Sequence, residues 1–326
     1  MMDPAIHRGE LPPSEVYRRF ALEARGTSAV YEHWAESVAD DVPVLDLLTE
    51  LPPSKRQPNL VFAAARLHGA GTSYSSFHET LRGQWAAVRT TILARSTQTN
   101  EAARCAVLLP FLAALPQPLA LIEVGASAGL CLLLDRYSYR YSDGTVVDPD
   151  DGVSEVIIEC ELGPGITPPS VMPKVTWRAG IDLSPVDVND AEDRTWLEAL
   201  VWPEHHDRRA RLHAAMDLAR HDPPRLVRGD LVQELPALAA EAPVDATLVV
   251  FHTAVLPYLD SASRSQFVDV VNRLPGYWIS NEGRGVVALN SPVPGPEPDH
   301  RFVVAVNGQP RALADPHGRS VTGLPH

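Results

Sequence analysis

Cysteine is scarce in this sequence, with three residues among 326, at Cys105, Cys131 and Cys160. Three is an odd number, and each cysteine lies inside an expected helix or strand. This favours reduced thiols in a cytoplasm over a disulfide framework. None of the three has the spacing of a metal ligand, so we expect no metal site.

Basic residues are also in short supply. Lysine and arginine total 28 against 41 aspartates and glutamates, which gives a formal net charge of −13 at pH 7. This charge repels phosphate backbones and disfavours a general nucleic-acid binder. Residues 1–13 lack an apolar core, and neither a signal peptide nor a membrane span is visible. We therefore expect a cytoplasmic protein with a small-molecule substrate and neither a nucleic acid nor a membrane as partner; the oligomeric state stays open.

Two kinds of pattern divide the chain near Pro118. From Ser14 to about Leu115 apolar residues recur at helical spacing, which predicts a helical N-terminal cap region over residues 1–117 without strands. After Pro118 strands and helices alternate, which is typical of a layered α/β sheet. We predict that this α/β domain covers residues 118–312, with a hairpin insertion near 137–162, and that residues 313–326 form a flexible tail.

The α/β region has a predicted order of elements. The strands are expected at 119–124, 175–183, 225–228, 246–251, 277–280, 286–290 and 302–306, the helices at 130–136, 193–221, 231–241 and 264–273, and a hairpin pair at 137–141 and 153–162.

The most specific motif lies at residues 119–134, where a buried strand, a tight glycine turn and an apolar helix follow one another. Such a turn places bare backbone amides and a helix N-terminus beside a ligand. Glu-x-Gly-x-x-x-Gly is typical of the nucleotide-side loop of S-adenosylmethionine (SAM) methyltransferases, and Gly-x-Ser-x-Gly is also the nucleophile elbow of α/β-hydrolases. The SAM interpretation makes cofactor contacts of Glu123, Gly125, Ala126, Ser127 and Gly129.

A serine hydrolase is the first alternative. The segment His68-Gly69-Ala70-Gly71 resembles the oxyanion segment of esterases, and Asp230 and His252 follow Ser127 in a usable chain order. In that fold several strands precede the elbow, whereas helices precede residue 119 here. The order of elements therefore favours the nucleotide loop, and His68-Gly69 is then predicted to end a helix.

The SAM interpretation predicts polar residues at the carboxyl ends of later strands, where open α/β sheets bind their ligands. Asp182 fits the acid that binds ribose hydroxyls, although it follows Glu123 by 59 residues, where a compact unit has about 20. The triplet Gly229-Asp230-Leu231 fits the position that faces adenine. His252 follows a strand where acceptor and sulfonium would meet, and is a candidate general base.

Each of these residues also has a purely structural interpretation. Ser127 could donate to the methionine carboxylate, act as a nucleophile or only cap a helix. His252 could be a core histidine with satisfied hydrogen bonds, and Asp182 and Asp230 could be turn-forming aspartates. Glu123 could bind the amino group of the cofactor or compensate a helix start.

Four further residues are weaker candidates. Asn100 and Arg104, with Glu101 between them, lie on one helical turn and either face the cofactor pocket or form an ordinary helix cap and ion pair. Tyr258 and Glu282 are polar residues near the ends of predicted strands. We place Tyr258 with His252 as a catalytic candidate, and Glu282 on the substrate side with Asn100 and Arg104.

Several segments together match the pattern of a known family: 98–101 with Arg104, 123–130, 135–137, 177–182, 196–197 with 200–204, 229–230 and 280–283. On these segments the chain resembles the bacterial domain-of-unknown-function family 2332 from about Ser14 to Gly285. That resemblance implies a methyltransferase-like fold with a helical N-terminal cap, and it supplies no substrate.

Together these patterns predict an α/β fold with a methyltransferase-like, Rossmann-type, mostly parallel sheet that binds SAM. The expected function is methyl transfer from SAM to a small molecule, with positioning as the main catalytic effect. A serine hydrolase and a non-catalytic SAM-binding or interaction protein are the alternatives.

Overall fold

The structure is a computed structural model that describes residues 11–98, 100–295 and 299–325. It divides into two compact units. The helical unit comprises Met1–Thr99 and Asn189–Ala210, and the sheet unit comprises Asn100–Val188 and Arg211–His326. The predicted boundary at residue 117 differs from this division, because residues 100–117 belong to the sheet unit and residues 189–210 to the helical unit.

Polar caps and prolines start the helices of the helical unit. The side chains of Ser28, Asp41 and Ser73 accept hydrogen bonds from backbone N–H groups in the first turn of their helices, which satisfies donors that a helix leaves free. The helices are α2 (Pro13–Ala24), α3 (Ala29–Asp40), α4 (Val42–Thr49), η1 (Pro53–Lys55), α5 (Pro58–Leu67), α6 (Tyr74–Ala94), α8 (Ala191–Leu200) and the first residues of α9 (His206–His221).

The core of the helical unit is aromatic. The Phe62 ring has its centroid 4.9 Å from that of Tyr31 and 5.3 Å from those of Trp34 and Phe77. The helical prediction is confirmed, since residues 11–98 and 100–118 contain no strand in the described structure. Gly69, with φ +96°, ends α5 as predicted for His68-Gly69.

The described residues of the sheet unit form one eleven-stranded sheet in the order β3-β2-β4-β11-β10-β9-β8-β7-β1-β5-β6. Six of the ten neighbouring pairs are parallel, so the predicted mostly parallel α/β sheet is confirmed. The strands are β1 (Leu119–Val124), β2 (Ser138–Tyr141), β3 (Val146–Val147), β4 (Ile157–Leu162), β5 (Val175–Asp182), β6 (Arg225–Arg228), β7 (Thr247–Thr253), β8 (Tyr277–Gly283), β9 (Phe302–Val306), β10 (Gln309–Ala314) and β11 (Ser320–Gly323).

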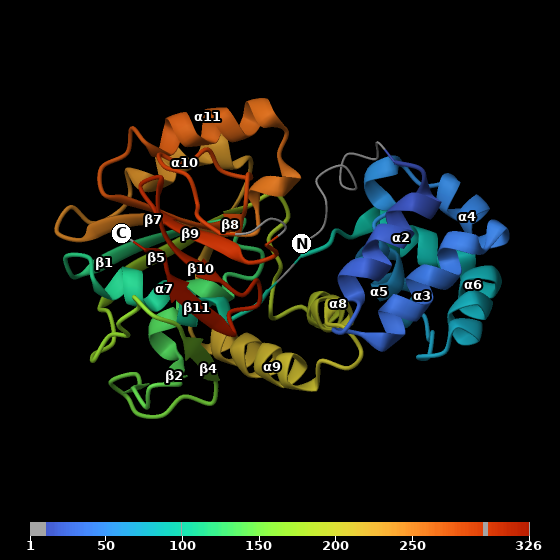
Figure 1. Cartoon of the computed structure of the whole chain (residues 1–326), viewed down its shortest axis with the longest axis horizontal. Coiled ribbons are helices and arrows are strands. Elements are labelled where there is room, and N and C mark those ends of the chain that lie inside the picture. Colours follow the sequence, from blue (N-terminus) through green and yellow to red (C-terminus); the bar gives the residue numbers. More distant parts are fainter. Residues whose placement is uncertain (1–10, 99, 296–298, 326) are drawn as a thin grey trace. The chain divides into compact units, whose positions relative to one another are not determined.

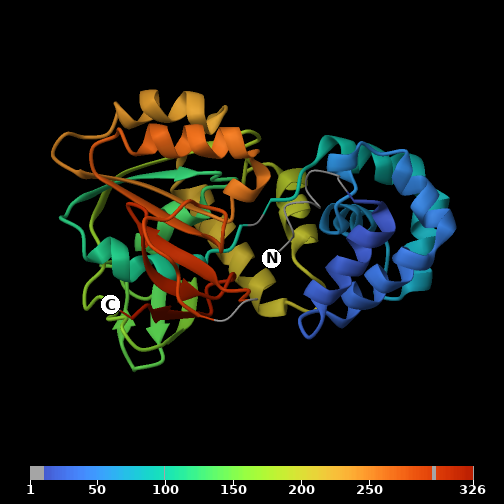
Figure 2. The same ribbon diagram turned by 45° about the horizontal axis from the view of Figure 1, so that its top comes forward.

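Helices cover both faces of the parallel part of this sheet (Figures 1 and 2). The helices α10 (Leu231–Ala239) and α11 (Ser261–Val271) pack on one face, against a cluster that includes Ile122, Val250 and Trp278. The helix α7 (Arg104–Ala113) and the 3-10 helix η2 (Leu130–Arg136) lie on the other face. Because side chains alternate along a strand, the neighbours of those core residues, Glu123 among them, point to the α7 face.

Four local predictions were wrong. The expected hairpin of 137–141 and 153–162 is a parallel pair, because the short strand β3 forms the antiparallel hairpin with β2 instead. The expected flexible tail forms β10 and β11, whose apolar residues Ala312, Leu313, Ala314 and Val321 are buried. Residues 286–290 are not a strand, and residues 130–136 are a 3-10 helix interrupted at Leu133.

Candidate functional site

The turn that follows β1 has an unusual backbone. Gly125, Ser127 and Gly129 all have positive φ, at +70°, +52° and +69°. Glycine adopts this conformation freely, but serine does so at a cost, and such residues concentrate at functional sites. The predicted glycine turn is therefore present, and it carries one strained non-glycine residue at its centre.

Two side chains from neighbouring segments hold this turn. The Asp182 carboxylate, at the end of β5, accepts the Ser127 N–H at 2.8 Å and the Ser184 N–H at 2.7 Å. The Asn100 amide donates to the Ser127 hydroxyl at 2.7 Å and accepts the Ala128 N–H at 3.1 Å. Asp182 and Asn100 thus lie at the turn, as predicted, and both make hydrogen bonds that fix its shape.

The glycines of the turn allow close packing within the chain. A Cβ atom on Gly125 would lie 2.4 Å from a Val255 methyl group, and one on Gly129 would lie 2.7 Å from the Pro224 ring. Gly180 on the neighbouring strand β5 makes room for Ala126 of the turn, because a Cβ on Gly180 would lie 2.5 Å from that of Ala126. Val255 therefore packs directly on the turn where the cofactor is predicted.

The loop that follows β7 resembles the turn after β1, because it also has a non-glycine residue with positive φ and is held by a carboxylate. Ala254, directly after β7, has φ +57°. The Glu282 carboxylate on the adjacent strand β8 accepts the Val255 N–H at 2.8 Å and the Leu256 N–H at 3.2 Å through its Oε1 atom. Of the three non-glycine residues with positive φ in the described chain, Ser127 thus lies in the turn after β1 and Ala254 in the loop after β7. The third, Asn307, belongs to the turn between β9 and β10.

His252 is a core residue, and its predicted role as a general base is not supported. The side chain is fully buried. Its Nδ1 atom bonds Glu282 Oε1 at 2.7 Å, and its Nε2 atom accepts the Trp278 indole N–H at 3.0 Å. Nε2 therefore carries no proton and Nδ1 does. Both ring nitrogens are used within the protein, on the α10–α11 face, so His252 helps Glu282 to hold the loop after β7.

The serine hydrolase triad does not assemble. Ser127 bonds Asn100, His252 bonds Glu282 and Trp278, and Asp230 caps α10 by accepting the Val232 and Gln233 N–H groups at 2.9 and 3.3 Å. A nucleophile must lie within hydrogen-bond reach of its base. His252 also points to the opposite face of the sheet from the Glu123 side chain, so this alternative is set aside.

The predicted adenine-side residues lie at the edge of the sheet. Gly229 and Asp230 follow β6, next to β5, and Leu231 begins α10 as a buried residue. Gly229 packs closely, since a Cβ there would lie 2.4 Å from Glu234. Asp230 Oδ1 accepts both of its capping hydrogen bonds. Asp230 is therefore a capping aspartate that lies one strand beyond Asp182.

Glu123 and Arg104 are buried together on the α7 face. Glu123 is 5 % exposed, and its Oε2 atom is buried without a hydrogen-bond partner. Burial raises the pKa of Glu123 well above its usual range, Cys131 and Asp182 add to the rise, and Arg104 opposes it. The Arg104 guanidinium donates to the Thr253 carbonyl and hydroxyl oxygens at 3.2 Å and stands over the Phe302 ring.

Tyr258 ends the short helix η3 (Leu256–Tyr258) in the loop after β7. Its side chain is half exposed. Desolvation of the hydroxyl raises the pKa of Tyr258, and the charge of Arg104 lowers it whereas that of Glu282 raises it. Tyr258 is the predicted catalytic candidate that stays accessible.

Sequence reasoning missed Asn281 and Thr253 as site residues. Asn281 is fully buried on β8, and neither its Oδ1 nor its Nδ2 atom has a hydrogen-bond partner. Thr253 is its register neighbour on β7. The available signal was the run of polar residues Ser280-Asn281-Glu282, which follows the apolar residues of the same strand and includes the predicted Glu282.

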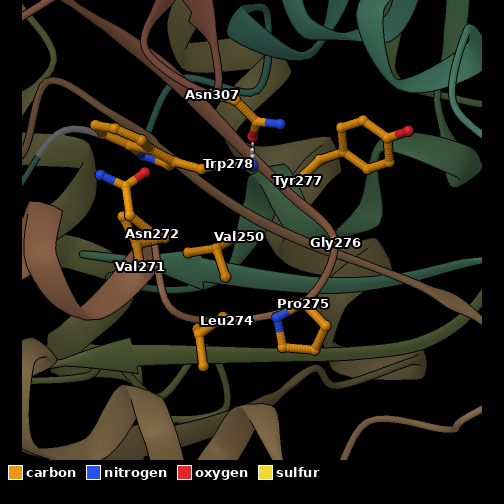
Figure 3. A pocket seen from close by; sticks show the side chains of 9 residues that line it. All are labelled: Val250, Val271, Asn272, Leu274, Pro275, Gly276, Tyr277, Trp278 and Asn307. Carbon is orange, nitrogen blue, oxygen red and sulfur yellow. Dashed lines mark hydrogen bonds between the residues drawn. The ribbon is translucent and has the colours of Figure 1, made fainter.

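Two hollows lie away from these residues. One, of about 220 Å³, opens at the amino end of β8 and is lined by Gly276, Tyr277 and Asn307, whose amide oxygen accepts the Trp278 N–H at 2.7 Å (Figure 3). Another, of about 430 Å³, lies beside Arg140, Ser142 and Arg319 near β2 and β4. No predicted site residue lines either hollow.

Within the described residues, no helix combines the length and the apolar composition needed to cross a membrane.

The fold and the site define an α/β protein with a mostly parallel sheet, whose loops after β1 and β7 are held by carboxylates. The chain belongs to the bacterial family described as "Uncharacterized protein conserved in bacteria (DUF2332)", whose model matches residues 14–322. Comparison with curated proteins and with solved structures gave no match.

Proposed function

We propose that this protein binds SAM at the ends of β1 and β7 and transfers its methyl group to a small molecule. The observation that carries the proposal is the strand order β6-β5-β1-β7-β8, all parallel. Numbered along the chain, these strands follow the order 3-2-1-4-5 of doubly wound nucleotide-binding sheets. In such sheets the ligand binds outside the carboxyl ends of the strands, where the order reverses, and here that point lies between β1 and β7.

The residues at this point suit an adenosylated amino acid. Glu123 Oε2 is a buried acceptor without a partner, which suits the ammonium group of the cofactor. The backbone N–H groups from Gly125 to Gly129 all bond within the chain, so the turn supports the proposal by its position at the end of β1 and not as an anion-binding nest. Asp182 ends the neighbouring strand, where an acid binds ribose in related sheets.

SAM supplies, when bound, a methyl group on a sulfonium that a positioned nucleophile can accept. The contribution of this chain is to bind and orient. Asp182 and Asn100 hold one loop, and Glu282 with His252 holds the other, so hydrogen bonds within the chain fix both loops. Tyr258 is an accessible polar side chain in the loop after β7, and we place it on the acceptor side.

The first experiment is calorimetric titration of the whole protein with SAM and S-adenosylhomocysteine. It compares the wild type with Asp182→Asn, which keeps the size of the side chain, and with Asp143→Asn as the matched control. Asp143 is exposed and accepts the Thr145 N–H in the turn between β2 and β3, at the opposite end of the strand order from β5. Thermal melts establish that each variant is folded.

The proposal predicts micromolar binding of both compounds to the wild type and to the control, and at least tenfold weaker binding to a folded Asp182→Asn variant. Absence of binding to folded wild-type protein would overturn the SAM assignment. Binding without methyl transfer to any acceptor would support the non-catalytic alternative instead, and would keep the cofactor site.

A further inference from the structure

Asn281 is a buried amide without a hydrogen-bond partner, a rare feature in a folded protein. Its side chain is 0 % exposed, and both Oδ1 and Nδ2 lack a partner. Leaving a buried donor or acceptor unpaired is costly, because the group has lost its hydrogen bonds to water and gained none in the protein. Such a group in a native protein calls for an explanation, for example a functional role or a bound ion or water.

The register of the strands places this amide beside the other polar groups of the site. Asn281 pairs with Thr253 across β7 and β8, and Glu123 pairs with Phe251 across β1 and β7. Since side chains alternate, Glu123, Thr253 and Asn281 all point to the α7 face. Arg104 binds Thr253 from that face, and Phe302 under Arg104 pairs with Gly283, two residues after Asn281.

We propose that Asn281 is the recognition residue of a second subsite, which binds a planar group with a donor and an acceptor side by side. A carboxamide, or the amide edge of a nucleobase, fits this description, because the amide of Asn281 offers the complementary pair. A carboxylate lacks the donor and a ketone lacks it too. Glu123 Oε2 lies on the same face and is a further acceptor for an N–H group.

This subsite lies on the acceptor side of the crevice. The strands assigned to the cofactor, β5 and β6, lie on one side of β1, whereas β7 and β8 lie on the other. That the bound amide belongs to the methyl acceptor rests on the proposed function, but the subsite itself does not. Because Asn281 is fully buried, binding requires local opening, so small probes are expected to bind weakly.

The test measures the binding of benzamide by ligand-observed NMR titration, with benzoate and acetophenone as probes of nearly the same size. The wild type is compared with Asn281→Leu, which keeps the number and branching of the heavy atoms in the side chain but removes the amide. The control is Asn272→Leu, because Asn272 lines the hollow of Figure 3 and reports binding there. If Asn281→Leu does not fold, Asn281→Ser takes its place.

Benzamide is expected to bind the wild type and Asn272→Leu with a millimolar Kd, and at least tenfold more weakly after Asn281→Leu. Benzoate and acetophenone are expected to bind at least tenfold more weakly than benzamide. Equal binding of the three probes, undiminished binding to Asn281→Leu, or no binding of benzamide at its solubility limit would each overturn the proposal.

Titration of the same samples with SAM separates the two proposals. Failure of SAM to bind, together with benzamide binding that depends on Asn281, would remove the methyltransferase assignment and keep the amide subsite. If SAM binds and benzamide binding does not depend on Asn281, the amide subsite is removed and the SAM assignment is kept. A crystal structure with the amide of Asn281 bonded to water at saturating benzamide would also overturn the subsite.

Discussion

The Asp182 carboxylate accepts a hydrogen bond from the Ser127 N–H at 2.8 Å, and this bond joins the end of β5 to the turn after β1. Glu282 does the same for the loop after β7 by accepting the Val255 N–H. Each of these two loops is thus held by a carboxylate from the next strand outward. Because Ser127 and Ala254 have strained backbones, these bonds preserve conformations that the chain would otherwise leave.

The bond between Asp182 and Ser127 predicts a cost to stability that is independent of any ligand. Asp182→Asn keeps one carbonyl oxygen and replaces the other acceptor by a donor, so either the Ser127 or the Ser184 N–H loses its partner. We expect the free energy of unfolding to fall by about 1–2 kcal/mol. Urea denaturation without SAM measures this, and an unchanged midpoint would contradict the bond.

Because Gly125 contacts Val255, the effects on stability of substitutions at these two positions are expected to be coupled. Gly125→Ala is expected to cost about 3 kcal/mol, since φ is +70° and the new methyl group would lie 2.4 Å from Val255. Val255→Ala removes the two methyl groups that clash most closely, but it leaves the Cβ of residue 255 at 3.1 Å from the new methyl group and does not relieve the backbone strain. The double variant is therefore expected to be more stable than additivity predicts by about 1 kcal/mol or more. Additive losses in denaturation experiments would show that the two side chains do not meet.

The raised pKa of Glu123 predicts a pH-dependent stability. A carboxyl group whose pKa is higher in the folded state binds its proton more tightly there than in the unfolded chain. Its contribution is complete below the unfolded pKa of about 4.5 and is lost as the pH rises through the folded value, at up to about 1.4 kcal/mol per pH unit. Glu123→Gln has no proton to lose, so its stability relative to the wild type is expected to increase from pH 5 to pH 8.

Chemical denaturation at several pH values measures this difference. Glu159→Gln is the control, since Glu159 is exposed on β4. A constant difference between Glu123→Gln and the wild type would mean that Glu123 is ionised in the folded protein.

The sequence predicted the parallel part of the sheet well, for a physical reason. The apolar strand 119–124 and the glycines after it are a local signal, because a strand buried on both faces and a left-handed turn each demand particular residues. Asp182 was found despite the 59 residues that separate it from Glu123, because an acid that follows an apolar strand is also a local feature.

The partners of those residues could not be predicted from the sequence. The bonds of His252 to Glu282 and Trp278 depend on the pairing of β7 with β8, which brings together residues 26 and 30 positions apart. The tail was predicted to be flexible, yet Val321 is buried because β11 pairs with β10, a pairing that the sequence does not show. Asn281 was missed because the sequence does not show which polar residues lack partners.

Asp299 predicts a stability change at acid pH. Its carboxylate binds Arg301 at 2.8 Å and Arg284 at 3.3 Å, and Arg301 is the main reason that the pKa of Asp299 falls from 3.8 to about 2. Its contribution is therefore complete above pH 4 and is lost between about pH 4 and pH 2. After allowance for screening of the half-exposed Arg301, Asp299→Asn is expected to cost about 1–2 kcal/mol at pH 7.

Thermal melts of Asp299→Asn and of the exposed control Asp143→Asn across this range measure the effect. The Tm of Asp299→Asn is expected to converge on that of the wild type near pH 2. A difference that persists at pH 2 would indicate that packing, and not charge, causes the loss.

The structural role of His252 predicts a large loss of stability and a defined tautomer. His252→Ala would leave a cavity beside Phe267 and remove one bond from Glu282 and another from Trp278, all of them buried. We expect a loss of about 3 kcal/mol or more in the free energy of unfolding, against less than about 0.5 kcal/mol for the exposed His300→Ala. The long-range ¹⁵N spectrum of the wild type at pH 7 should show His252 protonated at Nδ1. A small loss of stability together with protonation at Nε2 would contradict this arrangement and return His252 to the candidates for a general base.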